Sequence, residues 1–354
     1  MRLRSAAVLL CLAAGAAIPT TAEAHTAKAI WGPTRMPNGS SAFRVYRDLG
    51  VDVFQIQLVW DRVAPRRPRH PTRPGSYRWP KDVNEAVRMG RRYGIDVAIM
   101  VKGSPAWANG GRSSEWMPRP AHYARFLKAA SRHYRHVHRW MIWGEANRGA
   151  VFQPLAPRSR AGPRAYARLL DAAYVALKRR SRRNIVIGGM TFTFGDVYPS
   201  KWVRWMRLPS GRPPRLDWYG HNPFSRRPPD IRQPENAAFP GSRDISDMDL
   251  FSRELHRAYR RYPRFRRRGP RLWLSEFTVS SDHPNRAFSF AVSRREQARW
   301  LRGAFRVAHR VHAAGLGWFN LYDEPATDPA GLTTGLMTYG GAHKPAYRVY
   351  KRLR

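Results

Sequence analysis

Two glutamates stand at the ends of two apolar segments that lie far apart in the chain. Glu145 follows the apolar part of WMIWGEAN (residues 140–147), and Glu276 follows that of LWLSEF (residues 272–277). A carboxylate at the end of a buried apolar strand is costly unless it is paired or used. Two carboxyl groups on opposite sides of a sugar can hydrolyse a glycosidic bond, one as the acid and one as the carboxylate. The two residues therefore indicate glycoside hydrolysis if the fold brings them together.

Short apolar runs alternate with amphipathic segments along the whole chain. The runs span residues 27–31, 51–60, 95–101, 140–143, 185–189, 216–221, 272–277 and 315–321. Continuous apolar runs of this length are typical of strands buried on both faces of a parallel sheet. The alternation predicts one α/β domain over residues 25–354, a (β/α)8 TIM barrel. The alternative is an open doubly wound sheet, but that fold would carry a glycine-rich turn after its first strand, where this sequence reads WGPT.

In a (β/α)8 barrel the carboxyl ends of all eight strands open on one face. Glu145 and Glu276 would then end the fourth and seventh strands, on opposite sides of the barrel axis. Three long segments follow strands on that same face, at residues 61–80, 104–120 and 222–244. We expect these loops to shape a substrate cleft.

The sequences WMIWGEAN and LWLSEF resemble the catalytic strands of the retaining glycoside hydrolases of clan A, especially families 5 and 39. The resemblance runs from about Trp31 to the C-terminus and includes VKGSPAWA (residues 101–108) and YGHN (residues 219–222). It implies that Glu145 is the general acid/base and Glu276 the nucleophile. It also implies that His221 contacts the nucleophile and that Trp318 forms the floor of a sugar subsite.

Further side chains near these strand ends are expected to contact the sugar, because aromatic faces stack on sugar C–H surfaces and amides bind hydroxyls. The residues predicted to bind substrate are Trp60, Trp107, Trp143, Asn147, Tyr219, His221, Asn222 and Trp318. The mechanism needs Glu145 protonated and Glu276 ionised. We expect burial and the neighbouring charge to keep the proton on Glu145, and His221 or other donors to keep Glu276 charged. No metal or cofactor is required.

The sequence also departs from the clan. The clan usually has an Asn that binds the sugar 2-hydroxyl before the acid/base, and here that position is Gly144. The usual arginine at the end of the second strand is replaced by Gln55 and Gln57 as the inward candidates. Three explanations stay open: Asn147 or Asn222 supplies the contact, the substrate differs, or the barrel is catalytically weakened and only binds sugar.

Residues 1–24 have the pattern of a secretory signal peptide. A basic start precedes the apolar stretch from Ser5 to Ile18, and the small residues Ala22 and Ala24 suit cleavage after Ala24. The alternative is an uncleaved membrane anchor. Cleavage predicts a secreted protein, extracellular or periplasmic, without a membrane span. It would have no disulfide, because Cys11 is the single cysteine. We expect a monomer.

The composition is strongly basic, with 64 Lys and Arg against 24 Asp and Glu and a formal net charge of +40. Such a charge attracts acidic polysaccharides, nucleic acids and anionic lipids. The arginines are spread over every segment, which argues against a specific nucleic-acid site. The expected partner is an oligo- or polysaccharide, acidic in one version of the hypothesis. One alternative is a non-catalytic or weakened barrel that binds anionic polysaccharide. Another is a copper oxidase with His25 as its mature N-terminus, although such oxidases are β-sandwiches.

Overall fold

Eight parallel strands close into one barrel in the computed structural model, which describes residues 25–325, 327–328 and 331–353. The strands follow one another in sequence order, and β1 pairs with β8 to close the sheet. They are β1 Ala27–Trp31, β2 Val53–Val59, β3 Asp96–Lys102, β4 Arg139–Ile142, β5 Ile185–Phe192, β6 Trp218–Asn222, β7 Arg271–Phe277 and β8 Gly315–Phe319. Each overlaps one predicted apolar run, so the (β/α)8 prediction is confirmed. The doubly wound sheet is wrong, and so is the β-sandwich that the copper alternative needs. The predicted signal peptide lies outside the described residues.

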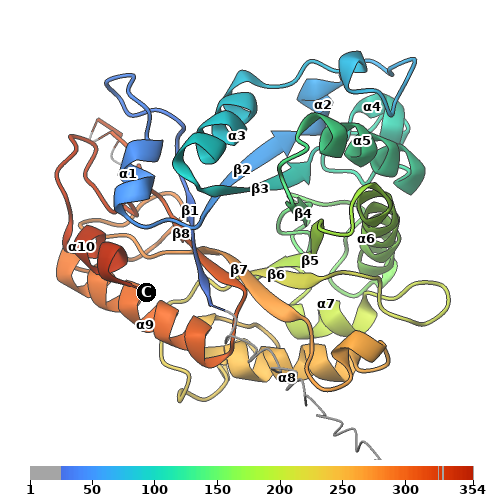
Figure 1. Cartoon of the computed structure of the whole chain (residues 1–354). Helices are drawn as coiled ribbons and strands as arrows, with labels where there is room; N and C mark the ends of the chain where they lie inside the picture. Colours follow the sequence, from blue (N-terminus) through green and yellow to red (C-terminus); the bar gives the residue numbers. More distant parts are fainter. Residues whose placement is uncertain (1–24, 326, 329–330, 354) are drawn as a thin grey trace, which may run out of the picture.

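Helices surround the strands as an outer ring (Figure 1). They are α1 Phe43–Asp48, α2 Trp60–Val63, α3 Lys81–Tyr93, α4 Ala106–Asn109, α5 Pro120–His133, α6 Ala161–Arg180, α7 Pro199–Trp205, α8 Met248–Tyr259, α9 Arg294–Arg310 and α10 Pro345–Arg352. Three short 3₁₀ helices join them, η1 Pro74–Ser76, η2 Ile245–Asp247 and η3 Pro263–Phe265. The long helices bury one apolar stripe each, as their spacing predicts.

The core has two parts because successive strand residues point to opposite faces. On β3, Ile99 faces the layer between the barrel and the helices, whereas Ala98 and Met100 face the barrel interior. The interior is small and contains side chains from several strands, among them Met141 and Trp273. It is therefore a packed core rather than a channel, and ligands must bind at a mouth.

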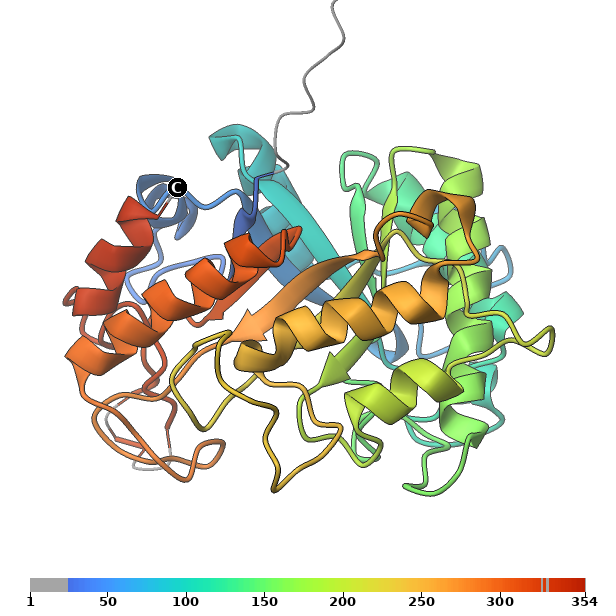
Figure 2. The ribbon, with the colours of Figure 1, turned by 90° about the horizontal axis from the view of Figure 1, so that it is seen from below.

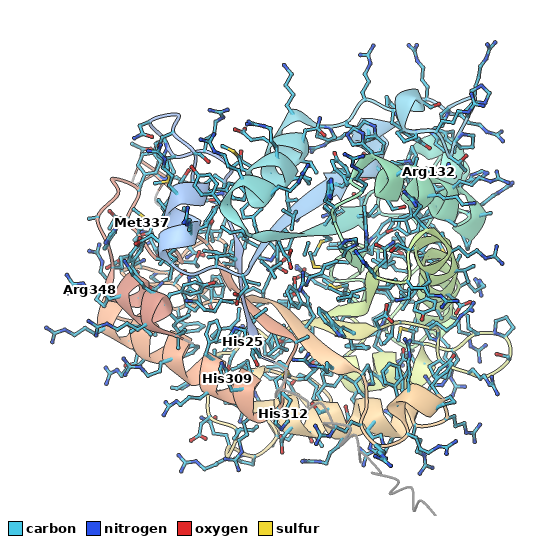
Figure 3. All side chains as sticks on the ribbon, in the orientation of Figure 1. His25, Arg132, His309, His312, Met337 and Arg348 are labelled. Carbon is cyan, nitrogen blue, oxygen red and sulfur yellow. The ribbon has the colours of Figure 1, made fainter. Side chains whose placement is uncertain are left out.

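The long loops lie at the carboxyl ends of the strands. In Figure 2 the arrow of β7 (orange) points towards the side on which the loops after β6 and β7 extend. Figure 3 shows nitrogen-tipped side chains projecting around the whole outline of the molecule, as the even spread of arginine in the sequence predicts. Within the described residues, no helix is both long enough and apolar enough to cross a membrane.

Candidate active site

A cavity of about 820 Å³ opens at the mouth of the barrel, and both Glu145 and Glu276 line it. Its size is within the range of small-molecule sites. The two glutamates reach it from the ends of β4 and β7, on opposite sides of the closed sheet. The structure therefore brings together two carboxyl groups that are far apart in the sequence.

The chain turns sharply where β4 delivers Glu145. Trp143 and Glu145 have φ angles of 64° and 46°, in the left-handed region that residues other than glycine rarely adopt. The turn is held by the Trp143 amide, which donates to Val101 O at 3.0 Å, and by the Ala146 amide, which donates to Met190 O at 3.0 Å. Each such conformation costs on the order of 1 kcal/mol, and costs of this kind collect at functional sites.

Glu276 lies where the β7–β8 pairing shifts register, between Leu274 and Phe277. Such irregularities re-aim a side chain at the end of a strand. The preceding residue, Ser275, points inward and its hydroxyl contacts Gln55 Oε1 at 3.3 Å. Burial, followed by the negative charge of Glu145, raises the pKa of Glu276 to about 8. One of the two carboxyl groups therefore keeps a proton at neutral pH.

Three polar side chains connect to this pair. The Arg148 guanidinium forms an ion pair with Glu145, and the Asn222 amide donates to Glu145 Oε1 at 3.1 Å. Lys102, Arg148 and a hydrogen bond from Asn222 each lower the pKa of Glu276, against the larger effect of burial. The Asn222 Oδ1 atom is buried and has no hydrogen-bond partner among the described residues.

Solved structures of glycoside hydrolases share this barrel. A family 39 glycoside hydrolase from Bacteroides cellulosilyticus aligns with a TM-score of 0.67 and 17% identity, over 93% of this chain and 63% of that chain. This chain shares the barrel fold of that enzyme. A family 39 β-xylosidase from Caulobacter crescentus aligns at 0.60 and 16% identity, over 93% and 71%. The β-glucuronidase 2 of Bacteroides uniformis aligns at 0.55 and 14% identity, over 93% and 35%.

The shared fold spans nearly all of this chain, but this chain spans less than two thirds of the first of these structures. The sequence itself matches no protein-family model. It also matches no curated protein. The similarity is therefore one of fold, as the resemblance of the strand-end sequences implied.

His221 does not contact Glu276, and the prediction that it supports the nucleophile is wrong. Its ring lies 2.8 Å from the Thr191 hydroxyl through Nδ1, and its Nε2 donates to Arg243 O at 2.7 Å. Burial lowers the pKa of His221 to about 4, so the ring is neutral. With both ring nitrogens used by neighbouring chain segments, the side chain has none left for the cavity.

The prediction took Glu276 as the charged member of the pair, but burial and the charge of Glu145 raise the pKa of Glu276 in this structure. The prediction also did not include Arg148, which forms an ion pair with Glu145. The prediction also named the wrong hydrogen-bond donor for Glu276, since Asn222 and not His221 provides the hydrogen bond.

None of the four predicted tryptophans lines the main cavity. Trp60 stacks on Phe126 at a ring distance of 4.9 Å in the helix layer, and Trp318 donates from Nε1 to Thr334 O at 3.0 Å. Both are fully buried, so their prediction as sugar platforms is wrong. The side chain that β8 presents to the cavity is Phe319, one residue later, because strand residues alternate between faces.

The other aromatic and amide predictions also place residues in the framework. Trp107 donates to Ala64 O at 2.8 Å and Trp143 donates to Val151 O at 2.9 Å, although Trp143 also borders a smaller cavity. Asn147 is fully buried and its Nδ2 donates to the carbonyls of Phe192 and Val197. Tyr219 is likewise buried and packs against Phe251. Trp143 therefore remains beside a cavity, whereas Trp107, Asn147 and Tyr219 hold the framework. Asn222 alone of the eight contacts the carboxyl pair within the described residues.

Several cavity residues were not predicted. Lys102 ends the apolar run of β3 in the same way that Glu145 follows the apolar run of β4. This similar position in the sequence could have identified Lys102 as a cavity residue. Lys102 lines both the main cavity and the adjoining one of about 280 Å³, which also contains Asp61 and Glu115. Gln57, which the sequence analysis named as an inward candidate on the second strand, lines both cavities as well. Phenylalanines on loops complete the main cavity and carry no periodic signal. Within the described residues, no three His, Cys, Asp or Glu side chains gather in a way that could hold a metal ion.

Proposed function

We propose that this protein is a secreted glycoside hydrolase that cleaves β-linked O-glycosidic bonds by a retaining double displacement. In this proposal Glu145 is the general acid/base and Glu276 the nucleophile. The observation that carries it is the convergence of these two carboxyl groups, from β4 and β7, in one cavity at the mouth of the barrel. The fold similarity to family 39 glycoside hydrolases supports the same reaction class.

Retention rather than inversion is favoured by how closely the two carboxyl groups interact. Asn222 donates to Glu145 and also lowers the pKa of Glu276 as a hydrogen-bond partner, so a single amide serves both groups. The charge of Glu145 raises the pKa of Glu276 in addition. A retaining enzyme uses a separation of about 5 Å, whereas an inverting enzyme leaves room for a water at about 6.5–9.5 Å.

The reaction proceeds in two steps. Glu276 attacks the anomeric carbon while the glycosidic C–O bond breaks, and Glu145 gives its proton to the departing oxygen. Glu145 then takes a proton from water, which attacks the same carbon and releases Glu276 as a carboxylate. The first step needs one proton in the pair, and the raised pKa of Glu276 shows that the pair retains a proton up to about pH 8. The second step begins with Glu145 as a carboxylate and returns the proton to it from water.

The proton must reside on Glu145 when substrate is bound. Arg148 forms an ion pair with Glu145 in this structure, and a protonated carboxyl group could not keep that ion pair. Catalysis thus requires Arg148 to leave Glu145 when the sugar enters, so that the proton passes to Glu145 and Glu276 becomes the carboxylate. The Arg148 side chain is about 41% exposed, which leaves it room to move.

The sugar is proposed to be a β-linked pyranoside, and an acidic sugar fits the charge of the cavity. The Lys102 side chain lines both cavities, and its charge lowers the pKa of Glu276 and of Glu115. Its ammonium group forms no hydrogen bond or close ion pair within the described residues. An unpaired, half-buried ammonium group is suited to a carboxylate ligand. Among the similar folds, one is a β-xylosidase and one a β-glucuronidase, so a neutral and an acidic sugar are both represented.

Secretion is proposed from the sequence of residues 1–24, with cleavage after Ala24. The first strand begins at Ala27, so cleavage there would leave the barrel intact. The mature protein is proposed to act as a monomer. N-terminal sequencing of the protein exported by its producing cell tests the cleavage site, and a mature chain that retains the apolar stretch would contradict it.

The reaction is tested with aryl β-glucosides, β-xylosides and β-glucuronides, using the wild type and the Glu276→Ala variant with and without azide. We expect the variant to be inactive alone and to form a β-to-α inverted glycosyl azide when azide is added, because azide replaces the missing nucleophile. Glu145→Ala should instead yield the glycosyl azide with retained configuration. Glu296→Ala, which removes a surface glutamate on α9, is the matched control and should behave as wild type.

Two outcomes would reject the proposal. Turnover that persists in both Glu276→Ala and Glu145→Ala would remove these residues from the reaction. Absence of turnover across the whole panel, with saccharide binding retained, would favour the alternative of a weakened, sugar-binding barrel.

A further inference from the structure

One wall of the main cavity is formed by phenylalanine side chains. Five rings contribute to it, from the end of β5 and from the loops that follow β5, β6 and β7. They are Phe192, Phe194, Phe224, Phe239 and Phe288, called here the phenylalanine wall. Neighbouring rings contact one another, with centroid distances of 6.3 Å for Phe192–Phe194, 5.7 Å for Phe192–Phe224 and 5.8 Å for Phe224–Phe288.

The wall is not part of the hydrophobic core. None of its five rings belongs to, or packs against, either buried core cluster of the described residues, and all five are partly exposed. Apolar surface left exposed in a concave site usually marks a place for an apolar ligand. One aromatic face can stack on the C–H surface of a sugar, but a phenylalanine ring offers no hydrogen bond to the sugar hydroxyl groups. A wall of five such rings therefore favours an apolar group.

The opposite side of the cavity has a different character. There Gln57 and Lys102 lie at the ends of β2 and β3, where the adjoining cavity adds the carboxyl groups of Asp61 and Glu115. The loops after β6 and β7 also bring Arg226 and Arg286 to the cavity, and the Arg226 guanidinium lies over the Phe194 ring, 6.0 Å from its centroid. A polar side towards β2 and β3 therefore faces a side on which phenylalanine rings predominate. A ligand that fits both sides has a polar part and an apolar part.

Glu145 connects the apolar side to the proposed chemistry. The Arg148 guanidinium that pairs with Glu145 also lies over the Phe192 ring, 4.8 Å from its centroid. The wall therefore begins beside the residue that would protonate the leaving oxygen. The group attached to that oxygen, the aglycone, would depart along the wall.

We propose that the phenylalanine wall is an aglycone site and that the substrates are glycosides of an apolar alkyl or aryl group rather than polysaccharides. This inference rests on the proposed function, because the proposed acid at Glu145 identifies the wall as the leaving-group side. It assigns the sugar to the polar side, at Gln57 and Lys102. The enzyme then removes a terminal sugar from an apolar carrier.

The test compares methyl and hexyl β-D-glucosides, and methyl and hexyl β-D-glucuronides. Alkyl alcohols have nearly equal acidity, so the chain length changes contact with the protein and not the ease of leaving. Dissociation constants are measured by calorimetry on Glu276→Gln, which binds without turnover, and kcat/KM is measured on the wild type. Burial of several methylene groups should make the hexyl member of a pair bind at least about tenfold more tightly.

The variant Phe194→Ala/Phe288→Ala removes two rings on exposed loops and should reduce the hexyl-to-methyl ratio severalfold. Tyr339→Ala is the matched control, because Tyr339 is an exposed aromatic residue (46%) outside the cavity. It should keep the ratio. Thermal unfolding shows whether the double variant folds. If it does not fold, the comparison of methyl and hexyl glycosides on the protein with an intact wall tests the aglycone site.

Equal affinity for methyl and hexyl glycosides would overturn the aglycone site, as would a hexyl preference that the double variant retains. Failure to bind any hexyl glycoside would also overturn it. Dimerisation that depends on the wall, seen by sedimentation, would assign the wall to a second copy of this chain instead. The azide experiment separates the two proposals. Turnover with equal kcat/KM for methyl and hexyl rejects only the aglycone site, whereas a hexyl preference in binding without turnover rejects only the reaction.

Discussion

The side chain of Met100 occupies the space in front of Gly144. A Cβ atom built on Gly144 would lie 2.6 Å from the Met100 sulfur and 3.3 Å from its terminal methyl group. Clan A enzymes usually carry Asn at this position. Here the Met100 side chain from β3 fills the space that such an amide side chain would need. The cavity has a thioether where the resemblance led us to expect a hydrogen-bonding group.

This arrangement predicts coupling between positions 100 and 144. Gly144→Asn should destabilise the protein by about 1–3 kcal/mol, because the new side chain must displace Met100. The double variant Met100→Ala/Gly144→Asn should recover part of that loss and show a clear interaction free energy in a double-mutant cycle from chemical denaturation. Gly75→Asn is the control, since nothing lies within 4 Å of a Cβ there. Additive effects of the two substitutions would contradict the prediction.

A second prediction concerns the stability cost of Glu276. Its pKa is raised in the folded protein to about 8, from an ordinary value of 4.5. Between these two pH values the folded state binds more protons than the unfolded state, so the free energy of unfolding falls as pH rises. Glu276→Gln removes this effect and should raise the unfolding temperature by several degrees at pH 8 and little at pH 4. Glu296→Gln should show no such gain, and an equal gain at both pH values would argue against a raised pKa.

The fold was predictable because its signal is local and repeated. Strands buried on both faces require continuous apolar runs, and each of the eight runs overlaps a strand of the closed barrel. Glu145 and Glu276 could be identified because charged residues stand only at or beside the ends of such apolar runs, not in their middle. The barrel topology then brings them to one mouth, and no long-range detail was needed for that step.

The finer features of the site depend on information that a sequence pattern does not contain. Whether Trp318 or Phe319 faces the cavity is decided by strand parity, and the β7–β8 register shift lies beside it. His221 was expected in the cavity, but its partners come from Thr191 on β5 and from the carbonyl of Arg243 in a distant loop. Four of the five rings of the phenylalanine wall come from irregular loops, whose conformation has no period to detect.

A third prediction separates His221 from its neighbour Asn222. His221→Ala leaves a buried hole and two unpaired partners, so it should destabilise the protein by about 2–4 kcal/mol while changing kcat/KM of the folded enzyme little. Asn222→Ala should lower kcat/KM by at least about tenfold, because it removes a hydrogen bond to Glu145. Chemical denaturation and kinetics on the same preparations provide the two measurements. A larger catalytic effect at His221 than at Asn222 would restore the role that the resemblance gave to the histidine.

The pH dependence of stability distinguishes the same histidine. The pKa of His221 is lowered to about 4 from 6.5, so between these values the unfolded state binds the extra proton. Its contribution to stability is complete above about pH 6.5 and is lost as pH falls towards 4. We expect this acid-dependent loss to disappear in His221→Phe. A wild-type and a variant curve with the same slope between pH 4 and 6.5 would show that the ring is not held neutral.

The last prediction concerns Lys102 and the acidic sugar. Lys102 is the cation without a described partner at the junction of the two cavities, and its charge lowers the pKa of Glu276. Lys102→Met should therefore have two separate effects. Removing the charge raises the pKa of Glu276, so the pair keeps its single proton to a higher pH and the alkaline limb of kcat/KM moves upward from about pH 8.

The substitution should also lower kcat/KM for an aryl β-glucuronide by at least about tenfold relative to the matching β-glucoside, since the two sugars differ only in the carboxylate. Lys81→Met, an exposed lysine at the start of α3, is the control for a general loss of positive charge and should leave the ratio unchanged. Assays at 0.05 M and 0.5 M salt distinguish a direct contact from attraction by the basic surface, because only the latter is strongly screened. If Lys102→Met shifts the alkaline limb but leaves the glucuronide-to-glucoside ratio intact, Lys102 adjusts the carboxyl pair and the sugar on the polar side is neutral.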